Sequence, residues 1–317
     1  MANKGSGHSQ PALVVVGSIN ADLIAYSDEA KRIGNYVFGD RFAFNLGGKG
    51  LNQAVNAASS GANTVLVGRV GDDVFGETII TNLKSFGVNT DHIKIDRTAH
   101  TGIGHVRVSA SGEYDTVVVN GANSNLQFTE VENALSHVEQ ISFGLMNYEI
   151  SAEVISASAA LVRARGGSTI INFSPVVPNV NYEISDADYL VANADEIRSL
   201  LGQETTDIPT LANAVRAKGA KNVVVTLGEH GAFGLDESGS SFTVRAEAVQ
   251  ITNTIGAGDT FLAMLALALQ SGVSFETAIG FANYSAAIVC TKQESFLSGP
   301  DVLRAVKKFD LNIQGSK

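Results

Sequence analysis

The sequence predicts an α/β fold in which a mostly parallel central sheet carries helices on both faces. Patterns typical of buried strands alternate with helix patterns along most of the 317 residues, as parallel crossover connections require. A stretch rich in hairpin signals, from about residue 91 to residue 120, interrupts this alternation. The chain has five prolines and no linker rich in proline, serine or charge. We therefore expect one large domain over residues 12–317 with a small β appendage, preceded by a tail over residues 1–11.

Each predicted element follows from its residue pattern. Short apolar runs rich in β-branched residues predict buried strands, and longer segments with one apolar face predict helices. The predicted strands are residues 12–18, 64–70, 142–146, 168–172, 189–192 and 222–226. The predicted helices are residues 47–60 (including a glycine-rich turn), 74–86, 152–165, 194–201, 210–218, 257–271, 274–291 and 300–309.

The β appendage is predicted from two short β-branched runs, residues 105–109 and 114–119. Ser111 and Gly112 lie between these runs, a pairing typical of a hairpin turn. A hairpin of this kind does not fit into a parallel sheet. We therefore interpret it as part of a separate small sheet that acts as a lid.

Composition excludes several classes of protein. Apolar residues make up 44% of the chain, enough for a large core, and the net charge of −10 (22 basic against 32 acidic residues) argues against a nucleic-acid binder. Phosphate ligands stay open, because backbone amides and a metal can hold them. A single cysteine, Cys290, excludes a disulfide framework and favours a reducing compartment. With no apolar run long enough for a membrane span and no signal-peptide pattern, we expect a cytoplasmic protein without a membrane partner.

A Gly-Ala-Gly turn at residues 256–258 precedes an apolar helix. Glycines let the backbone approach a ligand, and the free N–H groups at a helix start attract anions. Asp259 lies in the first turn, where a carboxylate would repel phosphate unless it faces a hydroxyl that attacks phosphorus. Asp259 is therefore a candidate base, and Gly256, Ala257 and Gly258 are a candidate anion hole. A plain helix cap beside a turn is the alternative.

Two other segments carry polar groups suited to a polyol. The glycine-rich turn at residues 47–50 would let hydroxyls approach the backbone, and Asn52 on the following helix offers a donor and an acceptor. Asn20 and Asp22 follow the first strand, at the sheet edge where ligands bind in α/β folds, and an extended chain would place both on one side. A purely structural turn explains either segment as well.

Asn193 and Glu196 form the pattern of a helix cap with a capping box. Glu196 could also hold Mg²⁺ through water. The six histidines show no metal-ligand spacing, and residues 101–104 lack the third glycine of a dinucleotide-binding fingerprint.

The motifs described above, in their order along the chain, resemble those of the ribokinase family of sugar kinases, the phosphofructokinase-B type. The resemblance runs from about Leu13 to Phe309, and its two main motifs are GGKGLNQAVNAASSGA at residues 47–62 and NTIGAGDTF at residues 253–261. It implies a three-layer αβα sandwich, ATP and Mg²⁺ as cofactors, and a homodimer built by paired lids. The lid would be formed by segments near residues 19–26, 36–46 and 100–120.

The resemblance also implies roles for single residues. Asp259 is expected to activate a primary hydroxyl, and Glu196 is expected near magnesium and the phosphates. The sugar would be contacted by Asn20, Asp22, Gly48, Lys49, Asn52, Glu149 and Asp259. ATP would be contacted by Asn193, Thr226, Gly228, Gly231, Gly258 and Asn283.

Two departures concern the site for an activating K⁺ that the resemblance implies at Asn253, Ile255 and Ser298. Asn253 stands where the family usually has an aspartate, so a full negative charge is missing. Residues 294–298 read ESFLS in place of a Gly-Ala-x-x-Ser pattern, so a small residue has become Glu294. Either Glu294 restores the lost charge or the cation site is gone, and potassium dependence stays open.

The leading hypothesis is an ATP-dependent kinase that phosphorylates the primary 5-hydroxyl of D-ribose. A kinase of another sugar or of a nucleoside is an alternative on the same fold, although a nucleoside base would need an apolar or aromatic wall that the predicted sugar contacts lack. A non-catalytic protein that senses a sugar or a nucleotide is the alternative from another class. The presence of Asp259 argues against that third interpretation.

Overall fold

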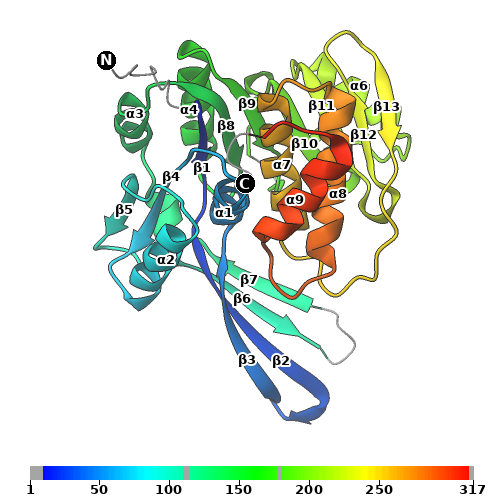
Figure 1. The fold of residues 1–317 in the computed structure, drawn as a ribbon. Coiled ribbons are helices and arrows are strands. Elements are labelled where there is room, and N and C mark those ends of the chain that lie inside the picture. The colour runs from blue at the N-terminus through cyan, green and yellow to red at the C-terminus, as the bar shows by residue number, and fades with distance from the viewer. Residues whose placement is uncertain (1–9, 110–113, 178–179, 314–317) are drawn as a thin grey trace.

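The central sheet has nine strands within the part of the chain that the computed structural model describes, residues 10–109, 114–177 and 180–313 (Figure 1). All neighbouring strands run parallel except at one edge, where the strand Ala232–Leu235 pairs antiparallel with both of its neighbours. In spatial order the strands are β13 (Ser241–Val244), β12 (Ala232–Leu235), β11 (Asn222–Thr226), β10 (Tyr189–Asn193), β9 (Ser168–Asn172), β8 (Ile141–Asn147), β1 (Ala12–Val16), β4 (Thr64–Gly71) and β5 (Ile93–Asp96).

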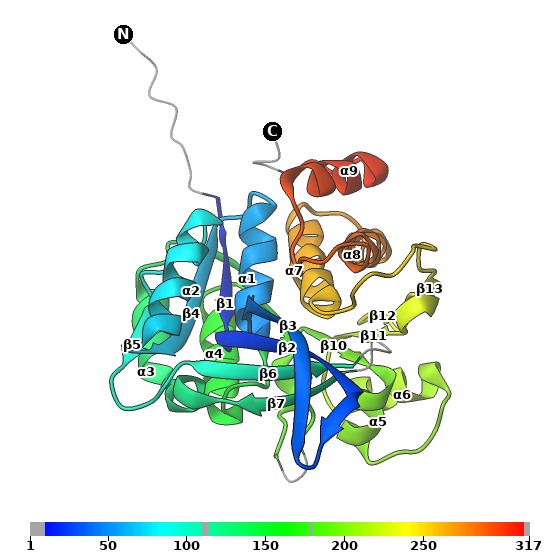
Figure 2. The same ribbon diagram turned by 90° about the horizontal axis from the view of Figure 1, so that it is seen from below.

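Helices cover both faces of this sheet and give three layers (Figure 2). Side chains of β1 alternate between the layers: Leu13 and Val15 pack into one apolar core, and Val14 and Val16 into the other. The first face carries α1 (Lys49–Ser59), α2 (Val74–Ser85), α7 (Ala257–Gln270), α8 (Phe275–Cys290) and α9 (Gly299–Phe309). The second carries α3 (Phe128–Ser136), α4 (Ala152–Ala164), α5 (Ala194–Leu201) and α6 (Ile208–Ala217).

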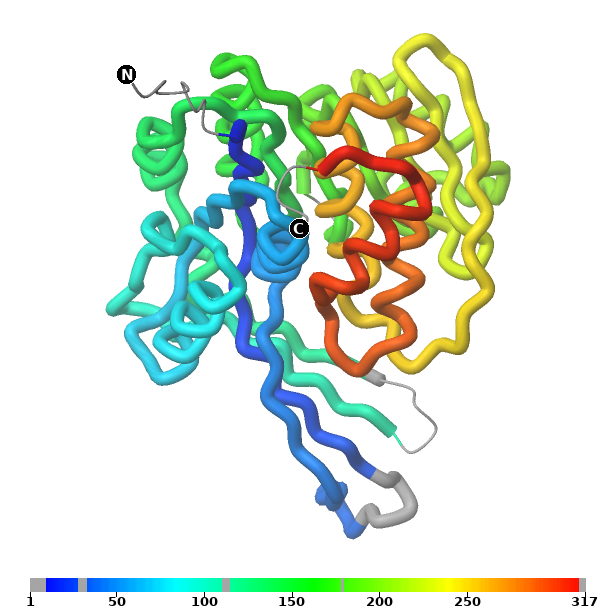
Figure 3. The backbone as a smooth tube through the Cα atoms, in the orientation of Figure 1, coloured from blue at the N-terminus to red at the C-terminus, as the bar shows by residue number. Residues whose placement is uncertain are grey.

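A separate four-stranded sheet projects from the carboxyl-terminal edge of the central sheet (Figures 1 and 3). We call this small sheet the lid. The predicted antiparallel pairing of residues 105–109 with residues 114–119 is confirmed, although the turn at Ser111 and Gly112 lies outside the described residues. The first lid strand is longer than the predicted segment 19–26. In spatial order the lid strands are β3 (Tyr36–Gly47), β2 (Asn20–Ile33), β6 (Gly102–Val108) and β7 (Tyr114–Val119).

The predicted α/β class is confirmed, and most predicted elements are present with small shifts at their ends. The sequence analysis missed α3, β5, β12 and β13. These elements are short, and the two-stranded antiparallel edge of β12 and β13 departs from the parallel crossover pattern used for prediction. No helix in the described ranges is both long and apolar enough to span a bilayer.

Candidate active site

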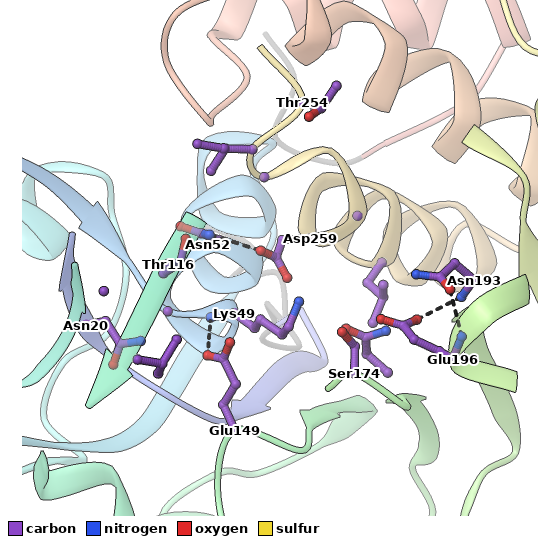
Figure 4. Close-up of a pocket in the computed structure, with 18 of the residues that line it drawn as sticks. Asn20, Lys49, Asn52, Thr116, Glu149, Ser174, Asn193, Glu196, Thr254 and Asp259 are labelled. Carbon is purple, nitrogen blue, oxygen red and sulfur yellow. Dashed lines mark hydrogen bonds between the residues drawn. The ribbon is translucent and has the colours of Figure 1, made fainter. Parts of the chain in front are cut away.

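A cavity of about 470 Å³ lies between the inner face of the lid and the carboxyl ends of the central strands (Figure 4). Its walls come from β2, β6 and β7 of the lid, the starts of α1 and α7, and segments that follow central strands. The structure brings together in this wall every residue that the sequence analysis assigned to sugar binding: Asn20, Asp22, Gly48, Lys49, Asn52, Glu149 and Asp259.

Asp259 lies in the first turn of α7 and is 6% exposed. Both of its carboxylate oxygens accept a hydrogen bond from α1: Asn52 Nδ2 donates to Oδ2 at 2.9 Å, and Gln53 Nε2 donates to Oδ1 at 3.1 Å. α1 and α7 pack side by side (Figure 2), which brings these distant parts of the sequence together. In Figure 4 the side chains of Asp259, Lys49 and Glu149 point into the same space.

Four carboxylates line this cavity, those of Asp22, Glu149, Glu196 and Asp259, and two of them have raised pKa values. Burial raises the pKa of Asp259, while the charge of Lys49 and the hydrogen bond from Asn52 oppose the rise. Burial, followed by the negative charges of Glu149 and Asp259, raises the pKa of Asp22 to about 7. A cavity with this excess of carboxylates favours ligands that donate hydrogen bonds, such as hydroxyl groups.

The lid strands leave space for the side chains of Asn20 and Asp22. In the parallel pairing of β2 with β6, Asn20 lies opposite Gly102 and Asp22 opposite Gly104. An added Cβ at Gly102 would come within 2.2 Å of Asn20 Oδ1, and one at Gly104 within 2.3 Å of Asp22 Oδ1. These two glycines therefore let the polar side chains lie across the neighbouring strand.

Glu149 and the turn before α1 are fixed by the segment that follows β1. The Ser18 hydroxyl and the backbone N–H of Lys49 both donate to Glu149 Oε2. Gly48 has a φ of 87°, and a Cβ there would come within 2.8 Å of the Ser18 carbonyl oxygen. Glycine is required at this position because the backbone is left-handed and tightly packed.

The predicted capping box at the start of α5 is confirmed. Asn193 Oδ1 accepts from the Glu196 N–H at 2.8 Å, and Glu196 Oε2 accepts from the Asn193 N–H at the same distance. Both residues line the cavity on the side away from Asn20 (Figure 4). Among the residues that the structure describes, no group of three or more histidine, cysteine or acidic side chains is arranged to hold a metal ion.

A second cavity of about 720 Å³, which we call the nucleotide groove, lies beside α7 and α8. It contains five of the six residues assigned to ATP: Thr226, Gly228, Gly231, Gly258 and Asn283. Its remaining wall is mostly small and apolar, with Ala246, Ala248, Val249, Ile251, Phe261, Ala286, Ala287 and the half-buried Cys290. The amide of Asn283 donates to the Arg245 carbonyl oxygen at 3.0 Å. Asn193, also assigned to ATP, lines the first cavity instead.

The two cavities meet at the start of α7, where Thr226, Thr254 and Gly258 line both of them. A Cβ at Gly258 would face open space, so the backbone here is open to a ligand. Within the predicted anion hole, the Ala257 N–H already donates to the Thr254 carbonyl oxygen at 3.3 Å. An anion at this junction would meet the positive end of the α7 dipole.

Two of the three residues assigned to K⁺ lie outside both cavity walls. Asn253 Nδ2 donates to the Gln293 carbonyl oxygen at 3.3 Å, and Asn253 Oδ1 accepts from the Ile255 N–H at 2.9 Å. The Ser298 hydroxyl donates to Asp301 at the start of α9. Only Ile255 of this set lines the first cavity.

The sequence analysis missed several residues that support the site. Asn123 Nδ2 donates to Asn20 Oδ1 at 2.7 Å, and Asn123 Oδ1 accepts from the Ile19 N–H, which holds Asn20 in place. Gln53 lies inside the quoted motif at residues 47–62, but its contact with Asp259 depends on the packing of α1 against α7. The alternating glycines 102 and 104 were considered only as a nucleotide fingerprint.

Comparison with known proteins agrees with this geometry. The model of the pfkB family of carbohydrate kinases matches residues 10–301. The chain is 35% identical over 280 residues to the ribokinase of Bacillus subtilis, covering 88% of this chain and 93% of that protein, and 31% identical over 313 residues to the ribokinase of Schizosaccharomyces pombe, covering 94% and 98%. Among solved structures, the ribokinase of Thermotoga maritima superposes with a TM-score of 0.84 at 27% identity, covering 94% of this chain and 99% of that chain. The Arabidopsis thaliana ribokinase complexed with ribose and ATP superposes with a TM-score of 0.82 at the same identity and coverage.

The family match, together with the fold and the paired cavities, identifies a phosphotransferase that acts on a hydroxyl group of a sugar. The chain belongs to the pfkB family of carbohydrate kinases.

Proposed function

We propose that this protein is an ATP-dependent kinase that phosphorylates the primary 5-hydroxyl of D-ribose. The observation that carries the proposal is the position of Asp259, a buried carboxylate in the wall of the polar cavity and next to the junction with the nucleotide groove. The relatives named ribokinase and the similar structure with ribose and ATP support ribose as the sugar.

Asp259 acts as the base in this proposal. Its carboxylate accepts the proton of the 5-hydroxyl while the oxygen of that hydroxyl attacks the terminal phosphorus of ATP. One P–O bond forms to the sugar, the bond to the bridging oxygen breaks, and ADP leaves with that electron pair. The Gly258 backbone at the start of α7 stabilises the negative charge that develops on the transferred group.

The polar wall accounts for a sugar as the acceptor. Asn20, Asp22, Lys49, Asn52 and Glu149 present donors and acceptors in a cavity of about 470 Å³, which suits a small polyol. The apolar groove with Asn283 suits a planar base, and Thr226, Gly228 and Gly231 also line it.

The residues present also fit magnesium. Mg²⁺ is typically bound by one or two carboxylates together with substrate phosphates, and it keeps several waters. The Glu196 carboxylate lies in the cavity wall beside Asn193, and we propose that it holds the ion through water. When bound, Mg²⁺ would neutralise part of the charge of the phosphates.

Potassium fits less well, and we infer that turnover does not require it. The Asn253 amide bridges to the Gln293 carbonyl oxygen by donating a hydrogen bond. A carboxylate could not donate, so an aspartate at this position would need a cation between the two oxygens. The Ser298 hydroxyl is engaged by Asp301.

We also propose that the lids pair to form a homodimer. In the lid register, Phe42, Val117 and Val119 lie on the face opposite to Asn20 and Asp22. These three apolar side chains are 54–65% exposed, and a second copy of the same face would bury them. Light scattering should give twice the chain mass, and Phe42→Asp should give the monomer.

A cytoplasmic location of the protein stays a prediction.

A coupled ADP-release assay over pentoses, hexoses, sugar acids and nucleosides, with K⁺ or Na⁺ as the only monovalent cation, tests the function. Turnover with ribose, equal in both salts, supports the proposal. Turnover with adenosine alone would contradict ribose as the acceptor but would still support phosphoryl transfer from ATP. No turnover with any acceptor would favour a protein that senses a sugar or a nucleotide. Asn253→Asp should become K⁺-dependent, and a wild type that needs K⁺ would contradict the role given to this amide.

A further inference from the structure

Two adjacent residues of α1 hold the carboxylate of Asp259, and they differ in their surroundings. Asn52 lines the first cavity, of about 470 Å³, which we call the sugar cavity after its proposed ligand, whereas Gln53 is fully buried and lies outside both cavity walls. The Gln53 amide reaches Asp259 from within the packing of α1 against α7, with Nε2 at 3.1 Å from Oδ1. Because a carboxylate only accepts hydrogen bonds, the NH₂ group of Gln53 must face it.

The carbonyl oxygen of the Gln53 amide, Oε1, does not contribute a hydrogen bond to the packing. It is buried and lacks a hydrogen-bond partner among the described residues. The Asn52 Oδ1 atom is in the same condition, but Asn52 itself lines the cavity, whereas Gln53 does not. A buried amide with an unsatisfied oxygen costs stability, and an apolar side chain of the same size would avoid that cost.

We propose that Gln53 is a positioning residue that fixes the orientation of the Asp259 carboxylate for proton transfer. Each carboxylate oxygen has two lone pairs, and the amides of Asn52 and Gln53 use one on each. The plane of the carboxylate is then fixed by bonds at both oxygens, which leaves defined lone pairs for the substrate hydroxyl. This role rests on the proposed function of Asp259 as base.

The same hydrogen bond has an electrostatic effect. Burial favours the protonated form of Asp259, and the bonds from Asn52 and Gln53 favour the charged form that can accept a proton. Without Gln53 the carboxylate would gain rotational freedom and its pKa would rise further. Both changes reduce the fraction of molecules with a base ready to react.

The test compares Gln53→Met, which keeps the side-chain volume and loses the donor, with Gln270→Met as a matched control. Gln270 lies at the far end of α7, where its Nε2 donates to the Pro11 carbonyl oxygen and its Oε1 is also buried, without a hydrogen-bond partner in the described part of the chain. The two variants should change the melting temperature by similar amounts. Only Gln53→Met should lower kcat, by about 10- to 100-fold, as expected for a misplaced catalytic group.

Two further readouts separate positioning from a structural role. The KM values for sugar and ATP should stay within about threefold, because Gln53 contacts neither cavity, and the acid limb of the kcat profile should move to higher pH. Gln53→Glu keeps the side-chain shape and adds a negative charge beside Asp259, so it should move the acid limb of the kcat profile to still higher pH. This variant replaces Gln53→Met in the test if Gln53→Met does not fold. A kcat within twofold of wild type, with an unmoved limb, would overturn the proposal.

A titration of the Asp259 carboxyl carbon by NMR makes the result independent of turnover. Its pKa should be higher in Gln53→Met than in wild type and unchanged in Gln270→Met. If the wild type phosphorylates a sugar other than ribose, the kinetic comparison is made with that sugar. If it phosphorylates none, the proposed function fails, and an equal pKa in wild type and Gln53→Met would separately overturn the role of Gln53.

Discussion

The sugar cavity and the nucleotide groove meet at the start of α7 but are built in opposite ways. The cavity, of about 470 Å³, is lined by four carboxylates, a lysine and several amides. The groove, of about 720 Å³, is lined mostly by alanines and other apolar side chains. Side chains in the cavity are held by a second residue: Asn123 holds Asn20, Ser18 holds Glu149, and Gln53 holds Asp259.

Under the proposed function, this difference follows from what each ligand requires. A sugar is recognised by hydroxyl groups that pair with buried polar atoms, and a displaced or missing partner leaves those atoms unsatisfied. A planar base is recognised mainly by a slot of the right shape, which small apolar residues provide. Changes in the cavity should therefore have large and specific effects, whereas changes in the groove should have smaller ones.

The largest effect is expected from Asp259→Asn. Loss of the general base should lower kcat by about 10²- to 10⁴-fold. Sugar binding should persist, because one of the two neighbouring amides, Asn52 or Gln53, can flip so that its buried oxygen accepts from the new NH₂ group while the other still donates to the new carbonyl oxygen. Calorimetry for sugar binding and ADP release for turnover measure the two parts, and near-normal turnover would refute the assigned role.

Gly104→Ala should damage sugar binding and spare the nucleotide groove. The new Cβ would lie 2.3 Å from Asp22 Oδ1 and displace that carboxylate. Loss of a hydrogen bond to a charged group should raise the sugar KM by about 10- to 100-fold. Gly299→Ala is the control, because a Cβ there meets nothing within 4 Å. An unchanged sugar KM in Gly104→Ala would contradict the assignment of Asp22 to the sugar.

These two predictions show how far the sequence could lead. Asp259 and the turn at Gly48 were predicted because each belongs to a local pattern in which a few neighbouring residues define the chemistry. Gly104 was seen but dismissed, since its meaning comes from lying opposite Asp22 in a sheet that joins distant segments. Gln53 likewise gains its role only when α1 packs against α7.

The same distinction holds for the fold. Strands β9 and β11 were predicted with correct ends, because buried parallel strands are short apolar runs bounded by polar residues. The full length of β2 was not predicted, because its outer half is polar and pairs with β3 beyond the central sheet. Pairing partners far apart in sequence decide such elements, and a single sequence does not specify them.

A smaller difference between the two regions is expected in the pH dependence of ligand affinity. Burial and the neighbouring negative charges raise the pKa of Asp22 to about 7, and its charged form is the one that accepts hydroxyl hydrogen bonds. As pH falls from 8 to 6 the charged fraction drops, so the sugar Kd should rise about tenfold, while the Kd for ADP stays level. In Asp22→Asn affinity should be weaker and independent of pH over this range. The same slope in that variant would show that another group titrates.

The smallest effect is expected at Cys290, the only cysteine of the chain. Its half-buried thiol lines the groove, and burial raises its pKa, so alkylation near neutral pH should be slow. ADP at about three times its Kd leaves about a quarter of the groove open, so the alkylation rate should fall about fourfold. Ribose should not protect the thiol, because its cavity has no wall at Cys290. Equal alkylation rates with and without saturating ADP would mean that the nucleotide binds elsewhere. The apolar lining of the groove and the polar lining of the cavity would then not reflect two different ligands.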